Sequence, residues 1–97
     1  MCVLALVARR DYYGYELVET ISKRIEISEG TIYPILRRLT LEKHFETYLQ
    51  ESAEGPPRKY YRMTAEGRTH TNRLLKSWKI FTEDVDFILT GRNSDKK

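Results

Sequence analysis

The sequence predicts a mainly α-helical fold with a two-stranded β-hairpin, an α+β chain in the order helix, helix, helix, hairpin, helix. Three observations predict this order. Apolar residues recur at helical spacing before and after a central segment, that segment holds two stretches typical of strands, and turn-forming residues separate the two stretches. Because a two-stranded hairpin is unstable alone, it must lean on the helices. The order is that of a winged helix-turn-helix.

The length and composition predict one structural domain. The 97 residues are 40% hydrophobic and 32% charged, which is typical of an ordinary globular chain. We expect residues 1–63 to form a winged head and residues 64–97 to form a C-terminal helix with a short tail. The net charge of +3 is compatible with a polyanionic partner but does not establish one.

The first helix is expected over residues 2–9, an apolar run that Arg10–Gly14 ends. This run is too short to span a bilayer, which needs about 20 apolar residues, and no basic segment precedes it as in a signal peptide. Cys2 is the single cysteine, so no intrachain disulfide can form and we expect a reducing cytoplasm.

The second helix is expected from about Tyr15 to Arg24. Apolar residues at three- and four-residue steps give it one buried stripe, formed by Leu17, Val18, Ile21 and Ile25. A short connector then leads to the third helix.

The third helix is expected to begin at Ser28, whose side-chain oxygen is suited to cap it by accepting a bond from a first-turn amide. Its apolar face comprises Ile32, Ile35, Leu36 and Leu39. At about 100° per residue, the opposite face comprises Gly30, Pro34, Arg37, Arg38 and Leu41. Because Pro34 removes an internal hydrogen bond, either the first turn is bent or the regular helix begins later.

The central segment predicts a hairpin. From Phe45 to Glu51 residues alternate, which is typical of a half-buried strand with Phe45, Thr47 and Leu49 on one side. Ser52–Pro57 is turn material, and we expect a long tip there. Arg58–Met63 is rich in β-forming residues and predicts the second strand.

The last helix is expected from a cap at Thr64 to about Leu89, with Gly91 as its stop and residues 92–97 as a frayed tail. Apolar residues at alternating steps of four and three form a seam, which comprises Leu74, Trp78, Phe81, Val85 and Ile88. Such a seam buries one helix against another along its length. We expect a second copy of the chain to cover it; the alternative is that the helix folds back on its own head.

No pattern in the sequence supports catalysis. His44 and His70 are isolated, and we find no glycine-rich phosphate loop, metal-ligand spacing or nucleophile elbow. We therefore expect neither an enzyme nor a bound metal or cofactor.

Two basic elements point instead to DNA. Arg37 and Arg38 lie opposite the apolar stripe of the third helix, and arginine can bind guanine bidentately or clamp a phosphate. In the second strand Arg58, Lys59 and Arg62 are interleaved with tyrosines, a pattern suited to phosphate or minor-groove contact. The alternatives are a solvated helix face and an edge strand whose cations only solubilise it.

Three blocks of the chain resemble the PadR family of bacterial transcriptional regulators. They are Tyr13–Leu17, Ser28–Leu39 and Gly55–Gly67, in the family's order and spacing, and the resemblance covers nearly the whole chain. The single long C-terminal helix is similar to that of the family's small subclass.

The resemblance implies a homodimer, usually a repressor, that binds a partly palindromic operator on the bacterial nucleoid in the cytoplasm. It implies that third-helix residues enter or border the major groove, namely Ser28, Thr31, Tyr33, Pro34, Arg37 and Arg38. It implies that Arg58, Lys59 and Tyr60 of the wing reach the flanking backbone or minor groove, with Tyr15 as a further phosphate contact. It also implies release by a small planar aromatic or phenolic molecule, for which Trp78 is the candidate ligand-binding residue; the alternative is that Trp78 is ordinary dimer core.

Two features depart from the family pattern. His44 stands where glycine is common, so we expect it to need a positive φ, which histidine adopts with difficulty. The chain also starts almost inside its first helix, where most relatives carry additional residues.

Two other functions remain open from the sequence. One is a winged-helix adaptor that binds protein through the same helix and wing. The other is a small-molecule-binding protein that uses the seam without binding an operator.

Overall fold

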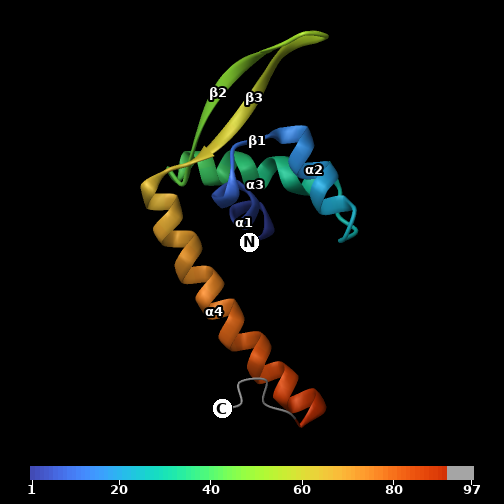
Figure 1. Cartoon of the computed structure of the whole chain (residues 1–97), viewed down its shortest axis with the longest axis vertical. Coiled ribbons are helices and arrows are strands. Elements are labelled where there is room, and N and C mark those ends of the chain that lie inside the picture. Colours follow the sequence, from blue (N-terminus) through green and yellow to red (C-terminus); the bar gives the residue numbers. More distant parts are fainter. Residues whose placement is uncertain (92–97) are drawn as a thin grey trace.

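The structure, a computed structural model, describes residues 1–91 and confirms the predicted winged helix-turn-helix with a long C-terminal helix (Figure 1). Its elements in order are α1 (Cys2–Arg9), β1 (Tyr12–Tyr13), α2 (Gly14–Ser22), α3 (Glu29–Leu41), β2 (Phe45–Ser52), β3 (Gly55–Met63) and α4 (Ala65–Thr90). The tail expected over residues 92–97 lies outside the described residues.

The sheet has a third strand that the sequence analysis missed. β1 pairs antiparallel with β3, Tyr12 opposite Tyr61 and Tyr13 opposite Tyr60, so that the strand order is β1-β3-β2. Because β1 is only two residues long and is followed directly by a helix, it has no alternating pattern that a sequence could display. It ties the start of α2 to the wing.

The hairpin has a tighter tip than predicted. β2 extends to Ser52 and β3 begins at Gly55, which has a φ of 149°, so the expected turn Ser52–Pro57 was wrong. Only Ala53 and Glu54 connect the strands. Pro56 and Pro57 of the expected turn lie in β3, but outside the part of β3 that pairs with β1. Because β1 does not extend to this part, the missing N–H groups of the prolines cost no hydrogen bond to β1.

The alternation in β2 does not correspond to burial along the whole strand. Phe45 at its base is 2% exposed, whereas Leu49, expected on the same buried side, is 67% exposed. Figure 1 shows the reason: the outer half of the hairpin projects past the helices of residues 1–91, which therefore leave it uncovered. The expectation of a half-buried strand holds only near the base of the wing.

One core lies between the helices and the base of the sheet. Its members come from α1, β1, α2, α3, β2 and β3 and are Val3, Leu4, Val7, Tyr12, Leu17, Ile21, Ile32, Leu36, Leu39, Phe45 and Tyr61. The predicted stripe of α3 is confirmed. The stripe of α2 was extended too far, because the helix ends at Ser22 and leaves Ile25 largely exposed.

Helix α3 begins directly after Ser28, which is the earlier of the two starts that the sequence left open. Ser28 occupies the N-cap position, Glu29 is the first helical residue, and Pro34 is tolerated inside the helix, so the later start was wrong. The predicted side-chain cap was also wrong. The Ser28 hydroxyl makes no cap bond and instead lies 3.4 Å from the Thr31 hydroxyl, while the Thr31 amide donates to the Ser28 carbonyl.

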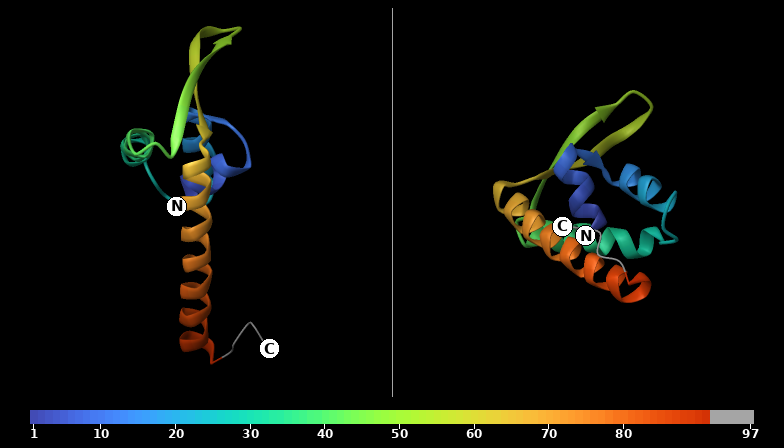
Figure 2. Two further views of the ribbon diagram at one scale, coloured as in Figure 1. Left: turned by 90° about the vertical axis from the view of Figure 1, so that its left-hand side faces the viewer. Right: turned by 60° about the horizontal axis from the view of Figure 1, so that its bottom comes forward.

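Both predicted ends of α4 are confirmed. The Thr64 hydroxyl accepts a hydrogen bond from the Gly67 amide at 2.9 Å, and Gly91 ends the helix with a φ of 73°. At 1.5 Å per residue its 26 residues span about 39 Å. The first turns of α4 pack on α1, and the rest stands clear of the head (Figures 1 and 2).

Where α3, the wing and α4 meet, the structure contradicts the expectation that His44 has a positive φ. The positive φ, 71°, belongs to Lys43, not to His44. The His44 ring is stacked on His70 of α4, with centroids 4.2 Å apart, and its carbonyl accepts bonds from the Thr64 amide and hydroxyl. Gly67 lies so close to this carbonyl that there is no room for a Cβ atom.

Candidate nucleic-acid interface

Helix α3 carries a polar and basic face that the other described residues leave uncovered. Thr31, Pro34, Arg37 and Arg38 are all exposed, whereas Ile32, Leu36 and Leu39 are buried and Ile35 is partly buried on the opposite side. Ser28 continues this face at the N-cap. The four exposed side chains and Ser28 were predicted as DNA contacts, and they share one side of one helix.

The two arginines of α3 have different neighbours. Arg38 lies 4.0 Å from the Glu42 carboxylate in an exposed i,i+4 pair, which stabilises little. Arg37 makes no ion pair within residues 1–91 and lines a cleft between α3 and the sheet. Arg37 is therefore the α3 cation whose charge is not already matched.

The structure separates the predicted wing contacts onto two faces of the sheet. Side chains alternate along a strand, so Lys59 shares a face with Tyr61, while Arg58 and Tyr60 share the other. Lys59 lines the cleft beside α3, and the Arg58 guanidinium lies over the Tyr13 ring, 4.6 Å from its centroid. The three wing residues cannot all approach one phosphate.

On the outer face, a row of three tyrosines crosses the sheet. Tyr60 of β3 packs against Tyr13 of β1, with centroids 5.8 Å apart, and stacks on Tyr48 of β2 at 5.6 Å. The Tyr48 hydroxyl donates to the Asp11 carboxylate at 2.6 Å, and this bond raises the pKa of Tyr48. The row links all three strands through side-chain contacts, and sequence reasoning missed it because it depends on the strand register.

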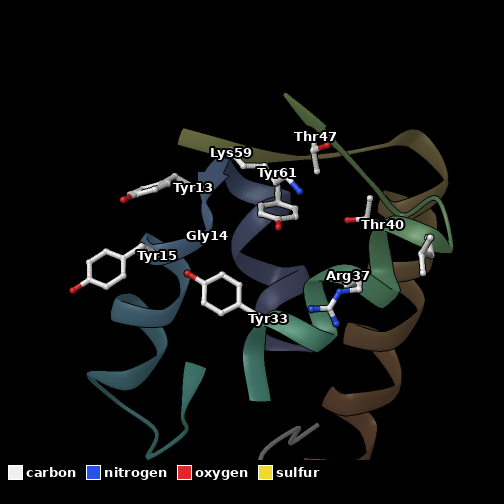
Figure 3. A pocket seen from close by; sticks show the side chains of 10 residues that line it. Tyr13, Gly14, Tyr15, Tyr33, Arg37, Thr40, Thr47, Lys59 and Tyr61 are labelled. Carbon is white, nitrogen blue, oxygen red and sulfur yellow. The ribbon is translucent and has the colours of Figure 1, made fainter. Parts of the chain in front are cut away.

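The cleft between α3 and the sheet has a volume of about 490 Å³. It is lined by Tyr13, Gly14, Tyr15, Tyr33, Arg37, Thr40, Leu41, Thr47, Lys59 and Tyr61. In Figure 3, Lys59 and Tyr61 reach it from the sheet and Tyr33 and Arg37 from α3, whereas the rings of Tyr13, in β1, and Tyr15, at the start of α2, lie at its edge and point outward. Of the predicted DNA contacts, Tyr15, Tyr33, Arg37 and Lys59 therefore meet at one place.

Two tyrosines of the cleft, Tyr33 and Tyr61, have raised pKa values. Burial raises the pKa of Tyr33, helped by the nearby Glu29 carboxylate. Burial also raises the pKa of Tyr61, although the neighbouring Arg37 partly opposes it. No described residue that lines the cleft is acidic, so Arg37 and Lys59 give it a positive charge.

Close packing at Gly14 fixes where Tyr33 lies. A Cβ atom on Gly14 would be 3.0 Å from the Cε1 atom of Tyr33, tighter than ordinary van der Waals contact. The absence of a side chain lets the first turn of α2 approach the ring. Tyr33 is thus held between α2 and the sheet, and it borders the exposed face of α3 without standing free on it.

The seam of α4 divides into a head-bound end and an uncovered end. Leu74 packs against the core of its own head. Trp78 and Phe81 are 50% and 57% exposed, with ring centroids 5.8 Å apart, and Ile88 is 78% exposed, whereas Val85 is partly covered. The exposed apolar side chains of this part of the helix also include Ile80, Phe87 and Leu89.

Residues 1–91 lack the features that two other kinds of site would need. No helix there is long and apolar enough to cross a membrane. In that same range, His, Cys, Asp and Glu side chains do not gather in threes as a metal ion would require.

A three-helix head with a β wing and a basic, exposed third helix defines a winged helix-turn-helix protein of the DNA-binding class. More narrowly, the sequence profile of the PadR-like family of transcriptional regulators matches residues 3–73, and the chain belongs to this family. An uncharacterized protein from Lysinibacillus sphaericus is 34% identical over 93 residues, which are 92% of this chain and 85% of that protein.

Solved structures support the same assignment. A Streptococcus mutans protein superposes with a TM-score of 0.86 at 40% identity, over 94% of this chain and 85% of that one. A PadR-like transcriptional regulator from Bacillus cereus gives a TM-score of 0.84 at 36% identity, over 94% and 90%. Bacillus subtilis PadR, solved in complex with operator DNA, shares the fold with a TM-score of 0.68 at 20% identity, over 76% and 43%.

Proposed function

We propose that this protein is a homodimeric repressor that binds operator DNA through α3 and the wing. The observation that carries the proposal is the face of α3 on which Thr31, Pro34, Arg37 and Arg38 stand exposed opposite the buried stripe. A helix that presents such a face fits the major groove, where arginine can bind guanine O6 and N7.

The remaining contacts follow from this docking. Ser28 and Thr31, at the N-terminal end of α3, are placed to contact base edges or the adjacent phosphates. Lys59 faces the cleft beside α3 and so meets the backbone that borders the same groove. Arg58 and Tyr60, on the outer face of the wing, reach the next backbone or the minor groove. Tyr15, half exposed at the start of α2, is a further phosphate contact.

The uncovered part of α4 supports the homodimer. Contiguous exposed apolar side chains on a helix that leaves its own head are typical of a surface that a partner buries. A second apolar surface lies on the head, between α1 and α2, where Cys2, Leu6 and Ile21 line a groove. A two-fold dimer would place two α3 helices on one DNA face, about 34 Å or one helical turn apart.

The proposal also covers how the DNA-bound dimer represses and how a ligand releases it from DNA. A dimer bound over a promoter excludes other proteins from the same DNA, and a small aromatic molecule that favours a different dimer geometry would release it. Trp78 and Phe81 lie together and exposed on α4, which makes them the candidates for stacking such a molecule. Their position on the proposed interface would couple ligand binding to the spacing of the two heads.

Fluorescence anisotropy with the DNA that lies just upstream of the protein's own gene tests the proposal. We expect tighter binding to this duplex than to a scrambled one, and a steep loss of affinity as salt rises, because phosphate contacts release counterions. Arg37→Gln should abolish the preference for the native duplex. Lys76→Gln, which removes one exposed charge from α4 on the side away from the seam, is the matched control.

Two results would contradict the proposal. Equal binding of both duplexes by a protein that light scattering shows to be dimeric would exclude recognition of this DNA. Affinity that does not change with salt would favour a protein-binding adaptor, since an apolar protein interface lacks the counterion term.

A further inference from the structure

One arginine of the wing is held in place by an aromatic ring alone. The Arg58 guanidinium lies over the Tyr13 ring, and within residues 1–91 Arg58 makes neither an ion pair nor a side-chain hydrogen bond. A cation is attracted to a ring face by the ring quadrupole, without a hydrogen-bond acceptor. The contact therefore restrains the side chain while its N–H donors stay available.

The other arginines that lie over tyrosine rings within residues 1–91 differ in this respect. Arg10 also lies 3.6 Å from the Glu16 carboxylate. Arg62 also lies 3.4 Å from the Glu46 carboxylate. Both of these cations are matched by an acid of the chain itself, whereas Arg58 is ordered and unmatched. Such a cation is suited to an anion outside the chain, to which guanidinium can bind bidentately.

The position of the Tyr13 ring is itself fixed. Tyr13 pairs with Tyr60 in the sheet, and its backbone amide donates to the Glu16 carboxylate at 3.1 Å where α2 begins. Its ring points outward from the cleft (Figure 3) and has the Tyr60 and Tyr15 rings as neighbours, with centroids at 5.8 and 6.3 Å. Arg58 lies two residues from Tyr60 on the same face, which makes it the diagonal neighbour of Tyr13 across the strands.

We propose that Tyr13 is a positioning residue for DNA binding, and that its ring holds the Arg58 guanidinium where it meets a backbone phosphate. The inference rests on the proposed function, in which Arg58 is a wing contact. An unrestrained arginine must lose rotamer freedom when it binds, and a contact already present in the free protein removes most of this cost. The apparent dissociation constant varies inversely with the fraction of molecules in the competent conformation. From the usual strength of an exposed cation–ring contact, loss of the ring should raise this constant about two- to fivefold.

The ¹⁵N relaxation of arginine Nε–Hε groups in the DNA-free, full-length protein tests the contact itself. We expect a higher order parameter for Arg58 than for Arg73, an exposed arginine of α4 that has no side-chain partner within residues 1–91. Tyr13→Phe should keep this difference and Tyr13→Leu should remove it, with circular dichroism to show that each variant is folded. An Arg58 side chain as mobile as Arg73 in the unsubstituted protein would overturn the proposal, whether or not the variants fold.

A double-mutant cycle, measured by operator anisotropy, tests the consequence for DNA. Tyr13→Leu should weaken binding about two- to fivefold with an unchanged salt slope, because Arg58 still reaches its phosphate. Arg58→Gln should lower the salt slope by about one. Tyr13→Leu should then cause no further loss in the Arg58→Gln protein, but its full loss in Lys76→Gln, the matched control. Tyr13→Phe, which keeps the ring, should bind as the unsubstituted protein does.

Three results of the cycle would overturn the proposal. Equal losses from Tyr13→Leu in both backgrounds would give Tyr13 a structural role only. A lower salt slope in Tyr13→Leu would mean that the wing itself has moved, and tighter binding would mean that the guanidinium must leave the ring to reach DNA.

The two experiments separate this proposal from the proposed function. If the unsubstituted protein binds no DNA, the proposed function fails and the positioning role fails with it, although relaxation would still show an ordered Arg58. If DNA binds with the expected salt dependence but Tyr13 and Arg58 are not coupled, only the positioning role fails.

Discussion

Gly67→Ala tests the joint that sets the wing against α4. On an exposed helix this change would stabilise by up to about 1 kcal/mol, because alanine is the better helix former. Here the new methyl group would collide with the carbonyl oxygen, carbonyl carbon and Cα of His44, all of which are backbone atoms. Backbone atoms cannot move to another rotamer as a side chain can, so the main chain itself must shift.

The loss in the free energy of unfolding follows from the contacts that this shift disturbs. Overpacking of a tight site costs about 1–3 kcal/mol. The His44 carbonyl also accepts hydrogen bonds from the Thr64 amide at 3.0 Å and from its hydroxyl at 3.1 Å, and each contributes about 1 kcal/mol. After the gain in helix propensity, we expect the free energy of unfolding to fall by about 2–4 kcal/mol.

Thermal unfolding at fixed protein concentration is the assay, since formation of the proposed dimer would make the midpoint depend on concentration. For a chain of this size each kcal/mol shifts the midpoint by about 4–8 °C, so Gly67→Ala should lower it by at least about 8 °C. Gly30→Ala is the matched control, because its Cβ would meet only the Ser28 hydroxyl at 3.6 Å. We expect Gly30→Ala to leave the midpoint unchanged or raise it. A stabilised Gly67→Ala protein would refute the packing described at this joint.

Three further predictions address the wing, the dimer and the sheet. Lys59→Ala should weaken all duplexes alike and flatten the salt slope of log affinity by about one; a loss confined to one sequence would show a base contact instead. Val85→Asp should give monomers in light scattering, and persistent dimers would place the interface elsewhere. The bond from Tyr48 to Asp11 raises the pKa of Tyr48, so its stabilising effect is present below pH 10 and is lost as pH rises through the raised pKa. Tyr48→Phe should therefore show less loss of stability between pH 9 and pH 11 than the parent; an equal loss would exclude this bond as the cause.

Elements with strong local signals could be predicted from the sequence. The stripe Ile32, Leu36 and Leu39 repeats at helical spacing and is buried as expected. The cap at Thr64 and the stop at Gly91 are local backbone chemistry, and the structure has both. Each of these features depends on residues a few positions apart, which is the range over which a sequence pattern is informative.

Features that depend on pairing between distant segments were missed or misplaced. The row of Tyr13, Tyr60 and Tyr48 and the two-residue β1 exist only because β3 pairs with both neighbours in one register. The positive φ at Lys43 arises where α3 turns into the wing, and the expectation had placed it one residue later. Local pattern identifies the elements, whereas their register decides which side chains meet.

The sequence also could not predict fully which candidate interface residues lie together. Arg58 and Lys59 are adjacent in sequence and the family resemblance implies one role for both, although strand alternation sends them to opposite faces. The cleft could have been anticipated in part. Tyr33 and Arg37 are four residues apart on a helix, and Lys59 and Tyr61 are two apart on a strand, so each pair shares a face. That the two pairs face one another follows only from the packed structure.

Methylation protection of guanine N7 by dimethyl sulfate, on the DNA upstream of the protein's own gene, tests the central claim most directly. Reading of the major groove by α3 predicts two groups of protected guanines about 10 base pairs apart, one for each protomer. The protection should be lost in Arg37→Gln and retained in Lys76→Gln. Bound DNA whose guanines remain fully reactive, or protection that survives Arg37→Gln, would show that α3 does not read the groove and would contradict the account.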